Sequence, residues 1–115
     1  MSAKSIAKKY FELSNAQDFN GIKDLFAEVL TYTSPALGKL TNRDEIIEKQ
    51  KEFYKAHKNV RWYDKTYKEI DKGTVIVDFE CENETKDGDL IRWSGLEYIS
   101  VKNGKISGVE IRLKS

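Results

Sequence analysis

The sequence predicts a single α+β domain, with helices mainly in its first half and an antiparallel sheet in its second. Two observations support this prediction. Apolar residues recur every three or four positions in residues 3–13 and 42–57, whereas three short turn signals divide residues 60–113 into strand-like segments. The 115 residues have the length of one domain, so we assign residues 1–115 to it. Helices first and sheet second is the order typical of the α+β class.

The chain is expected to begin with two helices. The first spans about three turns and carries an apolar stripe made of Ile6, Tyr10 and Leu13. Residues 15–20 break this pattern. Asp18 or Asn20 can then accept a hydrogen bond from the backbone of a second, short helix, because both side chains are good helix caps.

A short strand and a third helix follow. Residues 29–33 are β-branched or apolar, which predicts a strand that ends before Pro35. Asn42 to Glu45 form a capping-box pattern, in which the Asn42 side chain accepts from the Glu45 amide while the Glu45 side chain reaches back. The third helix should therefore start here and end near residues 57–59.

The second half of the chain predicts an antiparallel meander of four strands. Its turn signals are Asp71-Lys72-Gly73, Asp87-Gly88 and Asn103-Gly104, each of which can supply the positive-φ residue that a tight hairpin needs. The strands between these turns are expected at 60–70, 74–85, 89–101 and 105–113.

Two of these strands differ in their patterns. Along 74–82 apolar and polar residues alternate, so one face should be buried; it carries Val75, Val77, Phe79 and Cys81. Strand 89–101 has bulky residues on both faces, Leu96 and Tyr98 on one and Glu97 with Trp93 and Ile99 on the other. We expect one face to pack on the helices and the other to be covered by a second subunit, which predicts a homodimer through the sheet. The Glu97 face is a candidate for the outer, dimer-facing side.

Composition and charge exclude several classes of partner. The chain has 20 basic and 19 acidic residues, which nearly cancel, so it lacks the field of one sign that holds a nucleic acid. No apolar run approaches the about 20 residues of a membrane span. With a single cysteine and no signal-peptide-like start, we expect a cytoplasmic protein without a disulfide.

Several short strings along the chain resemble a known superfamily in their order and spacing. Residues 7–13, 18–22 and 25–28 form a helical opening, residues 42–46 a helix start, and residues 96–106 a last hairpin with Asn103-Gly104 at its turn. Together they resemble the nuclear transport factor 2-like superfamily, which includes SnoaL-like and ketosteroid isomerase-like proteins. The resemblance implies a cone-shaped (cystatin-like) domain, in which three helices and a curved, mostly antiparallel sheet enclose one mostly apolar cavity.

The resemblance also allows a comparison with the site of steroid isomerases, which pair an Asp base with an oxyanion hole of a Tyr and a protonated Asp. The family's tyrosine on the first helix falls on Tyr10. The base falls near Ser34, which cannot take a proton from carbon unaided at neutral pH. The second carboxyl falls on or beside Leu96, and supporting tyrosines fall near Phe26 and Gln50. Steroid isomerase activity is therefore not expected.

Glu97, His57 and Cys81 are the remaining candidates for chemistry. Glu97 lies among bulky residues, so a raised pKa and a role as a base are conceivable, but an ion pair with Arg92 or Arg112 is the favoured interpretation. His57 suits the C-terminal end of the third helix, and Cys81 should pack as a small hydrophobe. No metal site and no cofactor are expected, because no second histidine or cysteine accompanies these two.

Two classes of function remain. The first is a protein that binds a small apolar or aromatic molecule in its pocket, without steroid isomerase chemistry; the expected ligand-binding residues are Tyr10, Tyr32, Ser34, Phe53, Phe79, Leu96 and Tyr98. The alternative is an acid–base enzyme of the cyclase, dehydratase or isomerase type, with Glu97 as a relocated carboxylate and Tyr10 as its electrophilic partner. A protein-interaction module is a third, weaker interpretation. We favour binding, because carboxylates are missing where the isomerase chemistry needs them.

Overall fold

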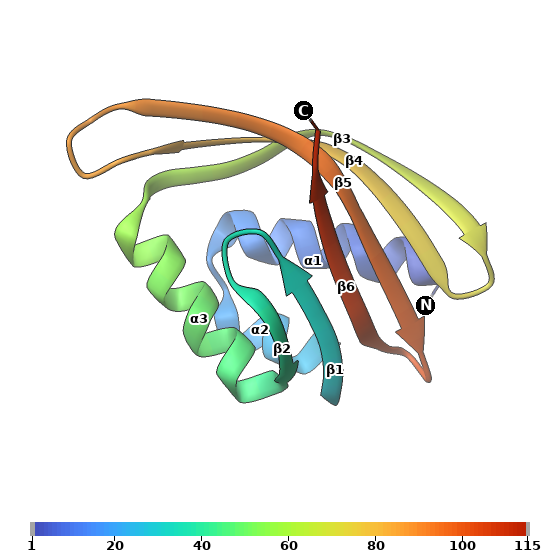
Figure 1. The fold of residues 1–115 in the computed structure, drawn as a ribbon. Coiled ribbons are helices and arrows are strands. Elements are labelled where there is room, and N and C mark those ends of the chain that lie inside the picture. The colour runs from blue at the N-terminus through green and yellow to red at the C-terminus, as the bar shows by residue number, and fades with distance from the viewer. Residues whose placement is uncertain (1, 115) are drawn as a thin grey trace.

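The computed structural model describes residues 2–114 and consists of three helices packed on one six-stranded sheet (Figure 1). In chain order the elements are α1 (Ala3–Ala16), α2 (Phe19–Leu25), β1 (Phe26–Ser34), β2 (Gly38–Asn42), α3 (Arg43–Ala56), β3 (Lys58–Asp71), β4 (Thr74–Glu84), β5 (Leu90–Lys102) and β6 (Lys105–Leu113). The predicted α+β class, with three helices on a mostly antiparallel sheet, is confirmed.

The strands lie in the order β2-β1-β6-β5-β4-β3. The meander from β3 to β6 is antiparallel throughout, as predicted, and β1 joins β6 in parallel. The long strands β3, β4 and β5 bend across the helices, which gives the sheet its curvature (Figure 1). β2 was not predicted, because its five residues are mostly exposed and carry no apolar alternation. The concave side of this curved sheet faces the helices (Figure 1).

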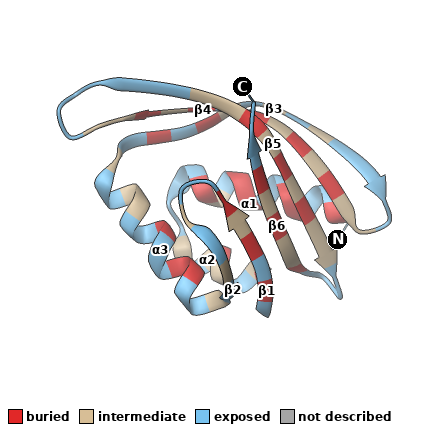
Figure 2. Ribbon diagram, viewed as in Figure 1, coloured by how far each residue is buried: buried red, intermediate tan, exposed pale blue. Residues whose placement is uncertain are grey.

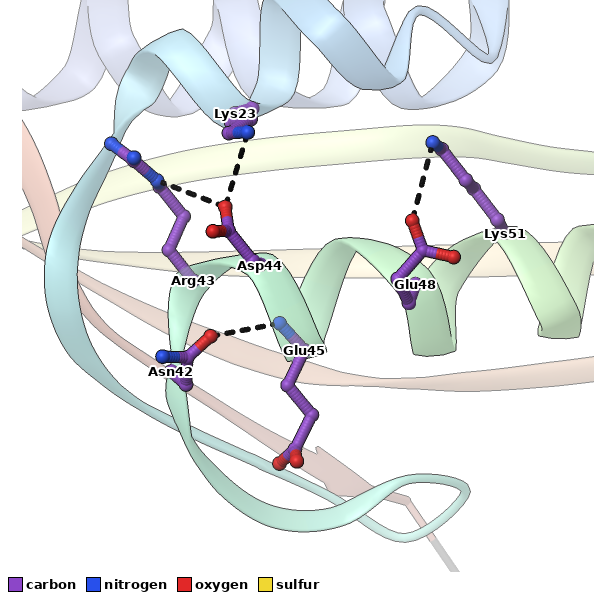
Figure 3. Close-up of polar contacts among 7 residues, drawn as sticks. All are labelled: Lys23, Asn42, Arg43, Asp44, Glu45, Glu48 and Lys51. Atoms are coloured by element: carbon purple, nitrogen blue, oxygen red, sulfur yellow. Dashed lines mark hydrogen bonds and ion pairs between the residues drawn. The ribbon is translucent and has the colours of Figure 1, made fainter.

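Side-chain caps fix the helix starts. Asp18, one of the two predicted caps, accepts from the Gly21 amide at 2.9 Å and begins α2. Asn42 accepts from the Glu45 amide at 3.0 Å and begins α3 (Figure 3). The Glu45 side chain points away from Asn42 in Figure 3, so the predicted reciprocal half of the capping box does not form. α3 ends at Ala56, with His57 as its C-cap, as the sequence indicated.

The three predicted turns connect the meander, but they do not share one mechanism. Gly88 and Gly104 have φ of 89° and 77°, as tight hairpins require. Gly73 has no positive φ, so the prediction for this position was wrong. A Cβ at Gly73 would lie 2.8 Å from the Val101 carbonyl oxygen. Glycine is needed there because two backbones approach closely, and the Val101 amide donates to the Gly73 carbonyl at 2.7 Å.

The core lies between the concave face of the sheet and the helices (Figure 2). The predicted alternation along β4 is confirmed, since Val75, Val77, Phe79 and Cys81 are all fully buried. On β5 the buried residues are Gly95, Glu97 and Ile99. The Glu97 face is therefore the inner face, and its proposed place on the outer side of the sheet was wrong. No helix of the described chain is long and apolar enough to cross a membrane.

Candidate ligand pocket

A cavity of about 40 Å³ lies between the concave face of the sheet and helices α1 and α3. Polar side chains from four different elements line it, among them Tyr10 of α1, Tyr32 of β1, Gln50 of α3 and Glu97 of β5. Because a single water needs about 10–15 Å³ of such space, this inner cavity has room for a polar group of a few atoms.

A larger cavity of about 400 Å³, the outer cavity, adjoins the inner one. Ser34, Ala36, Phe53, Trp93 and Ile111 line both. The outer cavity is otherwise mostly apolar, with His57 and Asn83 among its polar residues. The two cavities together have the form of a small-molecule site: an apolar space of suitable volume with a few polar groups at its inner end.

Glu97 is the acid of this pocket. It faces inward because its partners across the sheet, Val77 and Ile111, are both on the buried face of their strands. Its side chain is 1% exposed, and its Oε2 atom has no hydrogen-bond partner. Burial raises the pKa of Glu97 from 4.5 to about 8. At pH 7 the carboxyl is therefore mostly protonated.

The predicted ion pair of Glu97 with an arginine was wrong. Arg92 pairs with Glu82 at 2.8 Å, and Arg112 pairs with Glu110 at 2.6 Å. Both arginines lie on the exposed side of the sheet, because alternation along β5 and β6 turns them away from Glu97. Glu97 is left without a positive partner among the residues that the structure describes.

Tyr10 and Gln50 form the polar link between α1 and α3. The Gln50 Nε2 donates to the Tyr10 hydroxyl at 3.1 Å, and both side chains are buried. Burial raises the pKa of Tyr10 well above its ordinary value, with smaller contributions from Tyr32 and Glu97, and burial also raises the pKa of Tyr32. Both phenols are thus neutral hydrogen-bond donors at physiological pH. The Gln50 Oε1 is buried without a partner.

Aromatic rings form the remaining walls. Trp62 packs edge-on against Phe11 and Trp93, with ring centroids 5.7 and 5.2 Å away. The Trp62 Nε1 donates at 2.8 Å to the hydroxyl of Tyr54, which also lines the pocket. Edge-to-face packing of this kind makes a rigid, polarisable wall.

The expected ligand-binding residues divide into three groups. Tyr10, Tyr32, Ser34 and Phe53 line the pocket. Phe79 lies behind its wall, packed against Trp62 and Trp93. Leu96 and Tyr98 lie on the opposite face of β5, where Arg112 covers the Tyr98 ring at 5.0 Å, so their assignment to the pocket was wrong. The alternation that buries Glu97 necessarily turns its two neighbours outward.

Ser34, His57 and Cys81 have structural roles. The Ser34 hydroxyl oxygen accepts from the Leu37 amide at 2.9 Å and so stabilises the turn between β1 and β2. The His57 Nδ1 lies 2.9 Å from the Phe53 carbonyl oxygen at the end of α3. Cys81 is fully buried, and burial raises the pKa of its thiol to about 12, so the thiol does not ionise at neutral pH. No cluster of three potential metal ligands occurs within residues 2–114.

Gln50 was missed as a pocket residue in its own right. A sequence signal for it exists: Gln50 follows Ile46 and Ile47 by four and three positions, on the stripe of α3 that is buried. A polar side chain at an apolar position of a helix indicates either a buried hydrogen bond or a binding site. Gln50 makes a buried hydrogen bond with Tyr10 and also lines the pocket.

Comparison with known proteins supports the fold. A family model described as a SnoaL-like domain matches residues 7–109. A proposed polyketide cyclase from Pseudomonas putida superposes with a TM-score of 0.90 and 14% identity, covering 99% of this chain and 92% of that one. A protein of unknown function with a cystatin-like fold from Xanthomonas campestris superposes with a TM-score of 0.89 and 14% identity. The match covers 100% of this chain and 92% of that one.

A third solved structure contains a small molecule. It is a hypothetical protein with a ketosteroid isomerase-like fold from Catenulispora acidiphila, in complex with trimethylamine; it gives a TM-score of 0.83 and 16% identity, covering 93% of this chain and 83% of that one. No curated protein sequence matches the chain significantly. At such identities the solved structures show the fold alone, and the residues of the pocket must indicate the chemistry.

Proposed function

Since the chain belongs to the SnoaL-like domain family, we propose that it binds a small organic molecule in the pocket between its sheet and helices. The apolar or aromatic body of this molecule occupies the outer cavity, and its polar end enters the inner cavity beside Glu97. One observation carries the proposal: two buried oxygens, Glu97 Oε2 and Gln50 Oε1, border the inner cavity without a hydrogen-bond partner.

The energetics of these oxygens favour an occupied pocket. A buried polar atom without a partner costs about 1–3 kcal/mol. Two such atoms at one cavity form a local defect that a bound polar group would relieve. The outer cavity, at about 400 Å³, falls in the range of small-molecule sites. The Catenulispora acidiphila protein in complex with trimethylamine is a precedent for a small organic molecule on this fold.

Acid–base catalysis is the second candidate function, and one observation favours it. The pKa of Glu97, about 8, is close to the pH at which an enzyme acts, as a general acid or base requires. In a cyclase, dehydratase or isomerase, Glu97 would transfer the proton while the hydroxyls of Tyr10 and Tyr32 hold a substrate oxygen. Ser34 stands where isomerases place their base and is engaged in a turn, so steroid isomerisation stays excluded from the proposal.

A fragment screen followed by NMR tests the binding function. Small aromatic compounds should shift the amide signals of Gln50, Phe53 and Glu97, and Phe53→Ala should weaken their binding. Leu96→Ala is the matched control, because Leu96 lies on the opposite face of β5 and should leave binding unchanged. A screen in which no compound perturbs the pocket signals would contradict the proposal.

We also propose that a second copy of the chain covers the outer face of the sheet. Ile76, Leu96 and Tyr98 are half-buried there, and Ile76 pairs with Tyr98 across the strands. Sedimentation at high protein concentration should give the mass of a dimer, and Leu96→Glu should reduce it to that of a monomer. A monomeric wild-type protein under these conditions would refute the proposal.

A further inference from the structure

We propose that the polar end of the ligand is an ammonium group, which binds between the Glu97 Oε2 and Gln50 Oε1 atoms. This class of ligand, a primary amine with an aromatic or apolar body, rests on the binding function proposed above and narrows it. Three features of the pocket point to it: its unpaired hydrogen-bond acceptors, its single acid without a cationic partner, and its aromatic walls.

When Glu97 is ionised, its Oε2 atom and the Gln50 Oε1 atom both need hydrogen-bond donors. An ionised carboxylate and an amide oxygen only accept hydrogen bonds. The Gln50 Nε2 is already directed at the Tyr10 hydroxyl. A ketone or an ether could accept from the tyrosine hydroxyls or from the protonated Glu97, but it brings no donor for Gln50 Oε1. A primary ammonium brings three N–H donors, enough for both oxygens and a phenol oxygen.

The pocket contains one acid and no cationic side chain to pair with its ionised form. Glu97 is the only carboxyl that lines either cavity among the described residues, and no lysine or arginine lines them. His57 is the only other ionisable base there and lies in the outer cavity. An isolated carboxylate is costly in such surroundings unless a positive group pairs with it. In the free protein this cost keeps the carboxyl of Glu97 neutral, and a cationic ligand would supply the positive partner that the ionised form lacks.

The walls suit a cation as well. Aromatic rings from five elements line the two cavities, among them Tyr10, Tyr32, Phe53, Tyr54, Trp62 and Trp93. The faces of aromatic rings attract ammonium groups, and Trp does so most strongly. The inner cavity, at about 40 Å³, accepts the ammonium and a neighbouring carbon, whereas the outer cavity, at about 400 Å³, accepts a ring.

Binding of an ammonium should displace a proton from Glu97. The titratable groups around this residue are Tyr10 of α1, Tyr32 of β1, Tyr54 of α3, Tyr67 of β3 and Cys81 of β4. Burial raises the pKa of each, so all are neutral at pH 7, and none offers a positive charge to an ionised Glu97. In the free protein Glu97 is mostly protonated at this pH. The ammonium binds the ionised form, so the carboxyl proton leaves to solvent.

Calorimetry with a matched set of probes tests the inference. The probes are 2-phenylethylamine, the neutral 2-phenylethanol and the anionic phenylacetate, which share one aromatic body. At pH 8 the amine should bind at least about tenfold more tightly than the alcohol, and phenylacetate should not bind. Titrations at pH 7 in two buffers of different ionisation enthalpy should show release of close to one proton per amine bound.

Glu97→Gln separates the carboxylate from the shape of the pocket. Glutamine resembles the protonated acid, so the variant should fold and lose about tenfold or more in affinity for the amine, a larger loss than for 2-phenylethanol. Glu80→Gln is the control, because Glu80 is exposed on the neighbouring strand, outside the pocket, and the change of side chain is the same. This variant should keep both the affinity and the proton release.

The outcomes distinguish this inference from the proposed function. Equal affinity for amine and alcohol, amine binding without proton release, or an unchanged affinity in Glu97→Gln would each overturn the amine assignment. If other fragments bind the pocket and the amine does not, the amine assignment fails and the binding function stands. If no compound of any class binds, both fail.

Discussion

Gln50 donates a hydrogen bond to the Tyr10 hydroxyl at 3.1 Å and so connects α3 to α1 at the inner end of the pocket. The bond fixes the phenol that faces Glu97, and it directs the second amide atom of Gln50, Oε1, to a place without a partner. One pair of residues therefore has two roles: it holds two helices together and it shapes the polar end of the cavity.

The Tyr10–Gln50 pair should be energetically coupled. Tyr10→Phe removes the acceptor and leaves the buried Nε2 unpaired, so it should destabilise the protein by about 1 kcal/mol or more. Gln50→Leu should have a smaller effect, because it removes one bonded and one unpaired polar atom together. Urea denaturation of both variants and of the double variant gives the coupling energy, expected at about 0.5–1.5 kcal/mol. Strictly additive changes in the free energy of unfolding would contradict the hydrogen bond between Gln50 and Tyr10.

The start of α3 should depend on Asn42 and hardly on the side chain of Glu45. Asn42→Ala removes the acceptor of the Glu45 amide and should cost about 1 kcal/mol (Figure 3). Glu45→Ala should change the free energy of unfolding by only a few tenths of a kcal/mol, through loss of the favourable interaction with the helix dipole. Thermal unfolding of the two variants measures the difference. A loss in Glu45→Ala as large as that in Asn42→Ala would indicate that the reciprocal bond forms after all.

Much of this architecture follows from local patterns, and the Asn42 cap is one example. The meander, the buried face of β4 and the C-cap at His57 were also predictable, because turn residues and period-two alternation are local signals. The parallel pairing of β1 with β6 was not, since it joins residues far apart in sequence. Gly73 was misjudged because a close approach of two backbones leaves no mark on the sequence beyond the glycine itself.

The site was harder to predict than the fold, and β5 shows why. Both faces of this strand carry bulky residues, so the sequence pattern could not decide which one is buried. The helices decide it: once α1 and α3 cover the face of Glu97, Leu96 and Tyr98 must point outward. The resemblance to steroid isomerases had placed a carboxyl on or beside Leu96, and Glu97 occupies that neighbouring position on the inner face.

Cys81 should be unreactive in the folded protein. It is fully buried, and the pKa of its thiol, about 12, leaves almost no thiolate at pH 8. A thiol reagent such as a maleimide should therefore modify the chain only at the rate of unfolding, and quickly in denaturant. Rapid labelling of the native protein would place Cys81 outside the core.

Stability should fall as the pH rises, and Glu97 is the reason. Its pKa is about 8 in the folded protein, against 4.5 when unperturbed. Between pH 4.5 and pH 8 the folded state binds more protons than the unfolded state. The contribution of Glu97 to the free energy of unfolding is therefore fully present below pH 4.5 and is lost as the pH rises toward 8. Over this range the free energy of unfolding should fall by on the order of 1 kcal/mol per pH unit. Denaturation of the wild type and of Glu97→Gln measures it, and the variant should lack this slope and be the more stable protein at pH 8. Identical pH profiles would contradict a buried, neutral Glu97.

Direct titration of the Glu97 carboxyl by carbon-detected NMR tests the central claim, that the pocket contains an unpaired and neutral acid. Burial without a partner predicts a midpoint near pH 8, far above that of exposed acids such as Glu80 in the same spectra. A midpoint near 4.5 would mean that water or a positive group reaches Glu97, and it would contradict an unpaired, neutral acid at the inner end of the pocket.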